Sequence, residues 1–263
     1  IQNIGIYQKI IMVVEIVVHK KLKLKNAMFI EGMPGVGNVG QVTIGYLIEQ
    51  LKPELFAELY SSHFNHVVLI KPNAVAQPLM GYFYYYKPKN LVIYYGDQQA
   101  LTPEGTYELV NSILKFLKKI GVETVITLGG VQTTYKKTVK VYGVVSEESI
   151  KEEFKNYEID FENVSQNVGS IIGAIGMLTA FSRRYDMKSL CLLVESSTLP
   201  LIPDQRGAKV LLELLSKILD LEIDLSKIDK KVKEQQELMK KLTQTREAEK
   251  EKPEEEKRLS YLG

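Results

Sequence analysis

Short apolar runs alternate with amphipathic segments along most of this chain. Each run is short enough to be a buried strand rather than a helix. The runs cover residues 10–18, 27–31, 67–70, 91–95, 122–128, 140–145 and 189–194. Because segments with helical spacing separate several of them, we expect a three-layer α/β domain, with a largely parallel or mixed sheet flanked by helices.

The clearest helical pattern lies between the runs at 91–95 and 122–128. Thr102 has the residue type of an N-cap, Pro103 suits the first helical position, and Gly121 suits the C-terminal end. A strand, a helix and a strand in this order predict a crossover between two parallel strands. Two further helices are expected, over about residues 168–185 and from near Asp204 onward.

The character of the sequence changes near Leu225, so we expect an α/β domain over residues 1–225 and a charged extension over 226–263. The extension begins with apolar residues at alternating steps of three and four, which predicts a short heptad stripe. From residue 243 to 258 the stripe is absent and Pro253 interrupts any helix, which predicts a flexible, solvated tether. The tether ends in LSYLG, an apolar tip typical of a docking peptide; the alternative is a frayed terminus.

Composition narrows the classes of function. The net charge is +2 over 263 residues, which gives no electrostatic case for binding nucleic acid. The longest apolar stretch, residues 168–181, is too short to span a membrane, and we expect a cytoplasmic protein. One cysteine and three histidines exclude a Cys-rich zinc site and leave little material for a His-based one, so no metal is expected.

A glycine-rich turn, EGMPGVGNVG, follows the apolar run at 27–31 and precedes a helical pattern. Gly35, Gly37 and Gly40 have the spacing G-x-G-x-x-G of dinucleotide-binding turns, and Gly32 and Pro34 lie beside them. No Gly-Lys-Ser/Thr follows, which excludes a P-loop. The turn is therefore either a dinucleotide site or a structural connection.

The dinucleotide interpretation requires an acidic residue at the end of the next strand. The nearest candidates, Glu54 and Glu58, lie in KPELFAELY, which we interpret as helix or loop. Glycine also permits positive φ and close packing of a helix on a strand. We therefore favour a structural turn, with a small ligand as the alternative.

Two acidic residues follow strand-like runs, where α/β folds place functional loops. Asp97 follows the run at 91–95, and Glu195, with Ser196, follows the run at 189–194. A serine beside an acid with no apparent histidine partner is poor evidence for nucleophilic catalysis. Turn-forming residues explain the same sequences, so no catalytic residue is assigned.

Five segments occur here in a fixed order: EGMPGVGNVG, YYGDQQALTPEG, VITLGG, GAIGMLTAF and ESSTLPLIPDQRGAKVLLELLSKILDLEID. Together they resemble the proteasome assembly chaperone family, and more narrowly the archaeal homologues of its second eukaryotic member. The resemblance covers about residues 14–225. It implies a fold like that of purine nucleoside phosphorylases, with no known catalytic site and no cofactor, and a role as an assembly chaperone or ATP-independent activator of the proteasome core particle.

The resemblance also implies a docking tail. Some members end in a hydrophobic residue, a tyrosine and one further residue, and this tail inserts between subunits of the proteasome outer ring. Here Tyr261 is third from the end, and Leu262 occupies the place of the tyrosine. The expected docking residues are Leu259, Tyr261, Leu262 and Gly263.

Two other classes of function stay open. The first is a nucleotide- or nucleoside-binding enzyme, such as an ATP-grasp-like ligase, that uses the glycine turn. The second is a homo-oligomeric scaffold for another partner. A homo-oligomer is expected, because Gly169, Gly173 and Gly176 would allow close contact between helices and the heptad stripe after Leu225 could pair with another copy; the alternative is that both pack inside one subunit.

Overall fold

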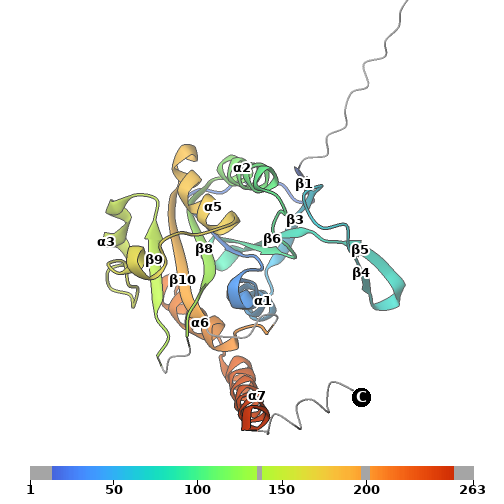
Figure 1. Ribbon diagram of the computed structural model, residues 1–263. Coiled ribbons are helices and arrows are strands. Elements are labelled where there is room, and N and C mark those ends of the chain that lie inside the picture. Colours follow the sequence, from blue (N-terminus) through green and yellow to red (C-terminus); the bar gives the residue numbers. More distant parts are fainter. Residues whose placement is uncertain (1–13, 135–137, 197–201, 252–263) are drawn as a thin grey trace, which may run out of the picture. The chain divides into compact units, whose positions relative to one another are not determined.

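The computed structural model describes residues 14–134, 138–196 and 202–251 (Figure 1). Contacts within the chain divide it into two compact units, Ile1–Ile223 and Asp224–Gly263. The first unit is a mixed α/β domain, as the sequence predicts. The second consists, in its described part, of one long helix.

An eight-stranded sheet forms the centre of the first unit, in the order β1-β3-β6-β7-β2-β8-β10-β9. Its strands are β1 (Val14–Val18), β2 (Ala27–Gly32), β3 (Glu54–Ser61), β6 (Gly81–Tyr86), β7 (Leu91–Gly96), β8 (Val122–Gln132), β9 (Val141–Val145) and β10 (Lys188–Ser196). The four central strands, β7, β2, β8 and β10, are parallel, and the outer strands pair antiparallel. The sheet is therefore mixed rather than largely parallel.

Helices cover both faces of the central strands (Figure 1). One layer holds α1 (Val39–Leu51) and α6 (Gln205–Leu219), and the other holds α2 (Pro103–Ile120) and α5 (Ala174–Ser182). Short pieces complete the unit: η1 (Val36–Asn38), η2 (Pro72–Ala74), η3 (Lys87–Lys89), η4 (Glu148–Ile150), α3 (Lys151–Phe154), α4 (Val164–Asn167) and η5 (Arg183–Tyr185). The main core lies between the sheet and the α2–α5 layer, around Phe29, Leu109, Ile113 and Leu178.

The crossover helix α2 has the predicted ends. Thr102 Oγ1 accepts a hydrogen bond from the N–H of Gly105 at 3.1 Å, and Pro103 occupies the first turn. Gly121 ends the helix with φ +94, in the left-handed region that favours glycine. The helix connects β7 to β8, and both lie parallel to β2 between them. Local capping signals were sufficient to place this element.

Three sequence expectations are wrong. The segment interpreted as helix or loop is strand β3, with a bulge between Leu55 and Ala57. The helix expected from residue 168 begins only at Ala174, after Gly173 adopts φ +97. The expected helix-to-helix surface also fails, because Gly169 precedes α5 and that helix packs inside the unit against α2, β8 and β10.

A small antiparallel hairpin stands apart from the main sheet. It consists of β4 (Val68–Lys71) and β5 (Val75–Pro78), which pair only with each other among the described strands. Figure 1 shows it projecting from the body beside β3 and β6. The hairpin lies between β3 and β6 in the sequence, so it extends from the connection between two paired strands.

The second unit contains α7 (Ser226–Glu251). The tether was predicted to begin at residue 243, which is wrong for the residues up to Glu251, because they continue the helix. Residues 252–263, including the predicted docking tip, lie outside the described part. No helix that the structure describes is both long and apolar enough to cross a membrane.

Candidate functional site

The glycine turn connects β2 to α1 and packs directly against neighbouring backbone. Gly37 has φ +61, which favours glycine. A Cβ atom on Gly40 would lie 2.6 Å from the carbonyl oxygen of Leu128 on β8, so glycine allows α1 to approach that strand. Gly35 is extended, with φ −165, and a Cβ atom there would meet only Gln99, at 3.9 Å. The fold therefore requires glycine at 37 and 40 but not at 35.

The start of α6 packs against the same turn. The N–H of Asp204 donates to the carbonyl oxygen of Gly37 at 2.7 Å, and Asp204 Oδ1 accepts from the N–H of Gly207 at 3.0 Å, capping α6. A Cβ atom on Gly37 would lie 2.4 Å from Oγ of Ser196. Asp204 is buried. An acidic side chain against the turn opposes the approach of a pyrophosphate.

The strand that follows α1 also differs from a dinucleotide-binding unit. Strand β3 lies antiparallel between β1 and β6, rather than parallel beside β2. Its acids are paired on the surface: Glu54 with Lys20, at 2.7 Å between Oε2 and Nζ, and Glu58 with His19, at 3.0 Å. Neither acid lies where a ribose bound at the turn would need it. Geometry thus favours the structural interpretation of the turn.

Gln99, in the loop between β7 and α2, connects three segments at this edge of the sheet. Its Nε2 donates to the carbonyl oxygen of Pro34 at 2.6 Å, and its Oε1 accepts from the N–H of Ala174 at 2.9 Å. Beside these contacts lies a pocket of about 210 Å³. Gln99, Gln132 and Ser170 are its only polar side chains among the described lining residues, and none is charged. Among these described residues, a phosphate would therefore meet no cationic side chain.

Glu31, on β2, is fully buried and was not singled out from the sequence. Burial raises its pKa to about 8, although the N–H of Leu128, 3.3 Å from Oε1, opposes the shift. Within the described chain, Oε2 meets no hydrogen-bond partner. The carboxyl group is therefore mostly protonated at neutral pH. Because Glu31 does not line the pocket, it is a neutral group inside the sheet rather than a base facing a ligand.

Asp97 connects β7 to the start of β6. Its Oδ2 accepts hydrogen bonds from the N–H of Met80 and from the hydroxyl of Tyr82, both at 3.1 Å. Its own N–H donates to the carbonyl oxygen of Met80 at 2.9 Å. These contacts explain an aspartate at the strand end without a ligand.

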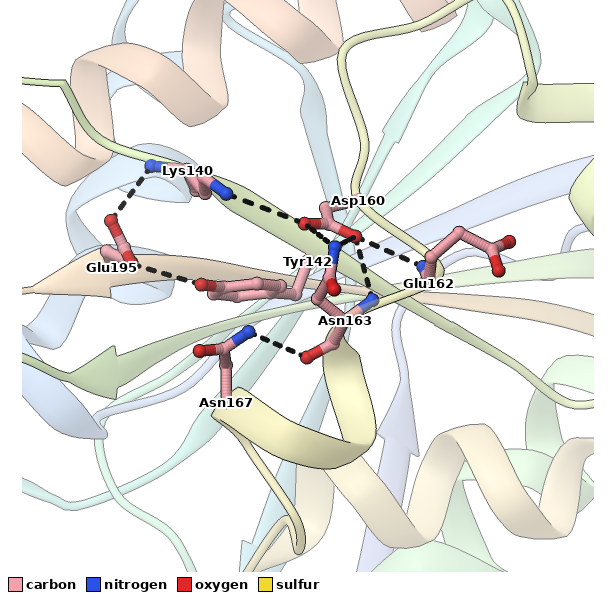
Figure 2. A network of polar contacts seen from close by, with 7 residues as sticks. All are labelled: Lys140, Tyr142, Asp160, Glu162, Asn163, Asn167 and Glu195. Atoms are coloured by element: carbon pink, nitrogen blue, oxygen red, sulfur yellow. Dashed lines mark hydrogen bonds and ion pairs between the residues drawn. The ribbon is translucent and has the colours of Figure 1, made fainter.

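Glu195 fixes the edge strand β9 to β10 (Figure 2). The buried carboxylate accepts from the hydroxyl of Tyr142 at 3.0 Å and from the N–H of Lys140 at 3.2 Å. Figure 2 shows the network continuing to Asp160, whose Oδ2 lies 3.8 Å from Lys140 Nζ. Hydrogen bonds from Asn163 lower the pKa of Asp160. Glu195 and Asp97 end strands that β2 and β8 separate, so they do not form a carboxylate pair.

The remaining candidates give no reactive centre. His63 pairs with Glu108, and no group of three or more His, Cys, Asp or Glu gathers in the described ranges to hold a metal ion. Cys191 is buried, which raises the pKa of its thiol to about 12.

The model of the PAC2 family matches residues 29–243. The chain belongs to the PAC2 family. The predicted resemblance to proteasome assembly chaperones is thereby confirmed, because the similar solved structures include archaeal proteins of that kind.

Three similar proteins match this chain over most of its length. Pyrococcus furiosus PbaB, an archaeal proteasome activator, is 34% identical, with a TM-score of 0.81 over 88% of this chain and 99% of that chain. Pyrococcus furiosus PbaA, an archaeal homolog of proteasome-assembly chaperone, is 29% identical, with a TM-score of 0.74 over 95% and 99%. Methanocaldococcus jannaschii MJ1210 is 32% identical over 246 residues, 91% of this chain and 93% of that protein.

Sequence reasoning located most of the elements around the glycine turn but missed two residues of this region, Glu31 and Gln99. The sequence does contain a signal for Glu31, because an acidic residue stands inside an apolar strand. It contains no signal for Gln99, because the hydrogen-bond partners of Gln99 come from segments distant in the sequence. The predicted tail residues, Leu259 to Gly263, lie outside the described ranges, so their role stays a prediction.

Proposed function

We propose that this PAC2-family chain is a non-enzymatic cytoplasmic factor that binds the proteasome core particle, as an assembly chaperone or an ATP-independent activator. The observation that carries the proposal is 34% identity to PbaB, an archaeal proteasome activator, over 88% of the chain. PbaA, an archaeal homolog of proteasome-assembly chaperone, is a second similar structure, and its description also refers to the proteasome.

The chemistry around the glycine turn supports a role without catalysis. Both strand-end carboxylates, Asp97 and Glu195, accept hydrogen bonds from within the fold. Glu31 is buried and mostly neutral. The neighbouring pocket has no charged group among its described lining residues. These features favour a scaffold over a nucleotide-handling enzyme.

The contact with the core particle is proposed to run through the C-terminal segment. Helix α7 has 26 residues, and at about 1.5 Å per residue it is a rod of roughly 39 Å. Beyond it in the sequence come Leu259, Tyr261 and Leu262. In the proposal Tyr261 and Leu262 fill apolar pockets between subunits of the outer ring. Self-association presents several such segments together and raises their avidity for a ring of identical pockets.

A pull-down with purified core particle tests the proposal. Full-length protein is compared with a chain lacking residues 259–263, with Tyr261→Ala, and with Ser260→Ala as a matched control in the same segment. We expect the deletion and Tyr261→Ala to reduce binding at least tenfold, and Ser260→Ala to bind as the wild type. Binding that is unchanged by the deletion contradicts the tail contact. A wild-type chain that fails to bind contradicts the function itself.

A nucleotide panel supplies the complementary test. Because a ligand that binds only the folded chain raises Tm, a nucleotide that raises it at millimolar concentration would favour the enzyme interpretation. We expect no shift.

A further inference from the structure

The pocket beside Gln99 lies where the pairing of two central strands stops. Strand β2 pairs with β8 only as far as Glu31 and Thr127, whereas β8 continues beside β10 as far as Gln132. The last residues of β8 therefore extend past the end of β2, and several of them line the pocket. Open α/β sheets bind their ligands at this carboxyl edge of the parallel strands. The pocket thus occupies the position that suits a small molecule in such a fold.

The deepest part of the pocket is apolar. We call its most buried lining residues the floor, and none of them exposes more than 8% of its surface; they are Met33, Leu128, Ile175 and Leu193. A water molecule inside a protein needs several polar partners, and these side chains supply none. An apolar group that fills the space therefore displaces poorly bonded water, which favours binding.

The entrance of the pocket is polar but uncharged. Gln132 and Ser170 line it and are exposed, and within the described ranges neither side chain is engaged in a hydrogen bond. Each side chain offers both a donor and an acceptor. Gln99, the third polar side chain, already uses its amide group within the fold. The entrance therefore offers hydrogen bonds to a neutral group above the apolar floor.

An exposed isoleucine lies at the entrance. Ile172 lines the pocket, yet it is 91% exposed. Its segment runs between Gly169 and Gly173, which have φ +71 and φ +97. A Cβ atom on Gly173 would lie 2.5 Å from Oε1 of Gln99, so glycine allows the segment to pass close to the loop after β7. An apolar side chain exposed to water gains free energy by covering a bound ring. Ile172 is placed to do so.

Gly35 gives a second observation. The fold does not require glycine there, because the backbone is extended and a Cβ atom would meet only Gln99, at 3.9 Å. Gly35 does line the pocket. A larger side chain at this position would begin beside Gln99 and take up space next to the lining. Glycine at 35 is therefore explained by the pocket rather than by the turn.

The lining defines the chemistry of the ligand. An ion would lose hydration without meeting an opposite charge among the described lining residues. The volume of about 210 Å³ exceeds the roughly 150 Å³ of an apolar cavity that holds benzene. It is smaller than the roughly 300 Å³ or more of sites for drug-sized molecules.

We propose that the pocket binds an uncharged molecule with one ring-sized apolar body and one hydrogen-bonding end. The body lies on the floor, the hydrogen-bonding end faces Gln132 and Ser170, and Ile172 covers the ring. This ligand site is separate from the contact with the core particle, and neither proposal depends on the other.

Three probes of nearly equal shape test the charge of the ligand on the full-length chain. Benzamide is uncharged, benzoate is an anion and benzamidinium is a cation at neutral pH. Isothermal titration calorimetry and ligand-observed NMR measure binding. We expect benzamide to bind with a Kd of about 1 mM or tighter, and both ions to bind at least tenfold more weakly. Failure of benzamide to bind at millimolar concentration, or equal binding of an ion, overturns the proposal.

A matched pair of substitutions locates the site. Val164 and Val168 both pack on the small core cluster around Tyr142, but only Val168 is among the described residues that line the pocket. Val168→Phe places a ring in the pocket and should weaken benzamide binding at least tenfold. Val164→Phe is the control and should bind as the wild type. Unchanged binding by Val168→Phe, or an equal loss in the control, overturns the assignment of the site.

Two exposed positions test the entrance without disturbing the core. Ile172→Ala should weaken benzamide binding about threefold, because it removes the apolar cover. The control is Leu101→Ala, at a side chain that is 62% exposed and is not among the described lining residues. Equal affinities of the two variants contradict the role of Ile172.

Gly35→Val provides a last test, because an extended backbone accepts a β-branched residue. We expect weaker benzamide binding and a Tm close to that of the wild type. Unchanged binding by a folded Gly35→Val variant contradicts the explanation of this glycine. Deletion of residues 259–263 should leave benzamide binding intact. The ligand site and the proteasome function can therefore fail separately.

Discussion

The edge of the sheet around the glycine turn and the projecting β4–β5 hairpin differ in how their side chains are satisfied. At the turn, Gln99, Asp97 and Glu195 each make hydrogen bonds within the fold. In the hairpin, Ile70 is 73% exposed, and the two strands pair only with each other among the described strands. The comparison teaches that contacts within the fold can account for residues around a conspicuous glycine motif. Exposed apolar residues, by contrast, can lie in a segment that carries no motif.

The largest expected effect is a pH dependence of stability caused by Glu31, and it tests whether water is excluded from the region around the glycine turn. Glu31 has a folded pKa of about 8 against an ordinary value of 4.5. Between these values the folded chain keeps a proton that the unfolded chain releases, so the free energy of unfolding falls as pH rises. At pH 8 the accumulated cost is on the order of 4 kcal/mol. Glu31→Gln removes it, so the variant should be more stable than the wild type at pH 8.

Urea denaturation at pH 5 and pH 8 measures this difference. The gap between wild type and Glu31→Gln should shrink toward pH 5. Glu104→Gln, at an exposed residue in the first turn of α2, is the control and should show no such trend. Parallel pH profiles for Glu31→Gln and wild type would mean that the carboxyl group is solvated, and that this region is open.

Two substitutions in the glycine turn, Gly37→Ala and Gly35→Ala, form a matched pair that tests which positions of the turn require glycine. Gly37→Ala forces alanine into positive φ and against Ser196, and it should cost about 2 kcal/mol or more. Gly35→Ala meets only Gln99, at 3.9 Å, in an extended backbone and should change stability by less than about 0.5 kcal/mol. Urea denaturation of both variants measures the pair. Equal losses of unfolding free energy would show that neither the positive φ of Gly37 nor its contact with Ser196 requires glycine at that position.

The smallest expected effect lies in the β4–β5 hairpin. Ile70→Ser should change the free energy of unfolding by less than about 0.5 kcal/mol, because this side chain is 73% exposed and loses few contacts. The buried Ile113→Val, in α2, is the contrast and should cost about 1 kcal/mol. A hairpin substitution as costly as the core one would mean that the hairpin packs on the rest of its own chain.

The sequence predicted those parts of the fold that local signals determine. The cap at Thr102, the glycine at Gly121 and the start of α6 after Asp204 were all expected and all occur. Strand β3 was missed because its apolar residues, including Leu55 and Phe56 at a bulge, do not alternate regularly. Strand β6 was missed because GYFYYY has aromatic residues on both faces and no clear period.

The candidate site was harder to predict, because its contacts join segments that are distant in the sequence. Gln99 connects Pro34 with Ala174, and no pattern near residue 99 indicates either partner. The spacing of the glycines indicated a turn but not which positions require glycine. That distinction depends on Leu128 and Ser196, which reach the turn only in the folded chain.

The place of β2 in the sheet has a consequence for protein synthesis. Strand β2 ends at Gly32, yet its two neighbours are β7 and β8, and the second is complete only at Gln132. Until that residue has left the ribosome, the nascent chain carries an apolar strand whose native partners do not all exist. The β6–β7 pair, joined through η3, is complete in sequence at Gly96, so both of its strands are available before β8 is. A nascent chain that exposes an apolar strand in this way is expected to be prone to aggregation over that window.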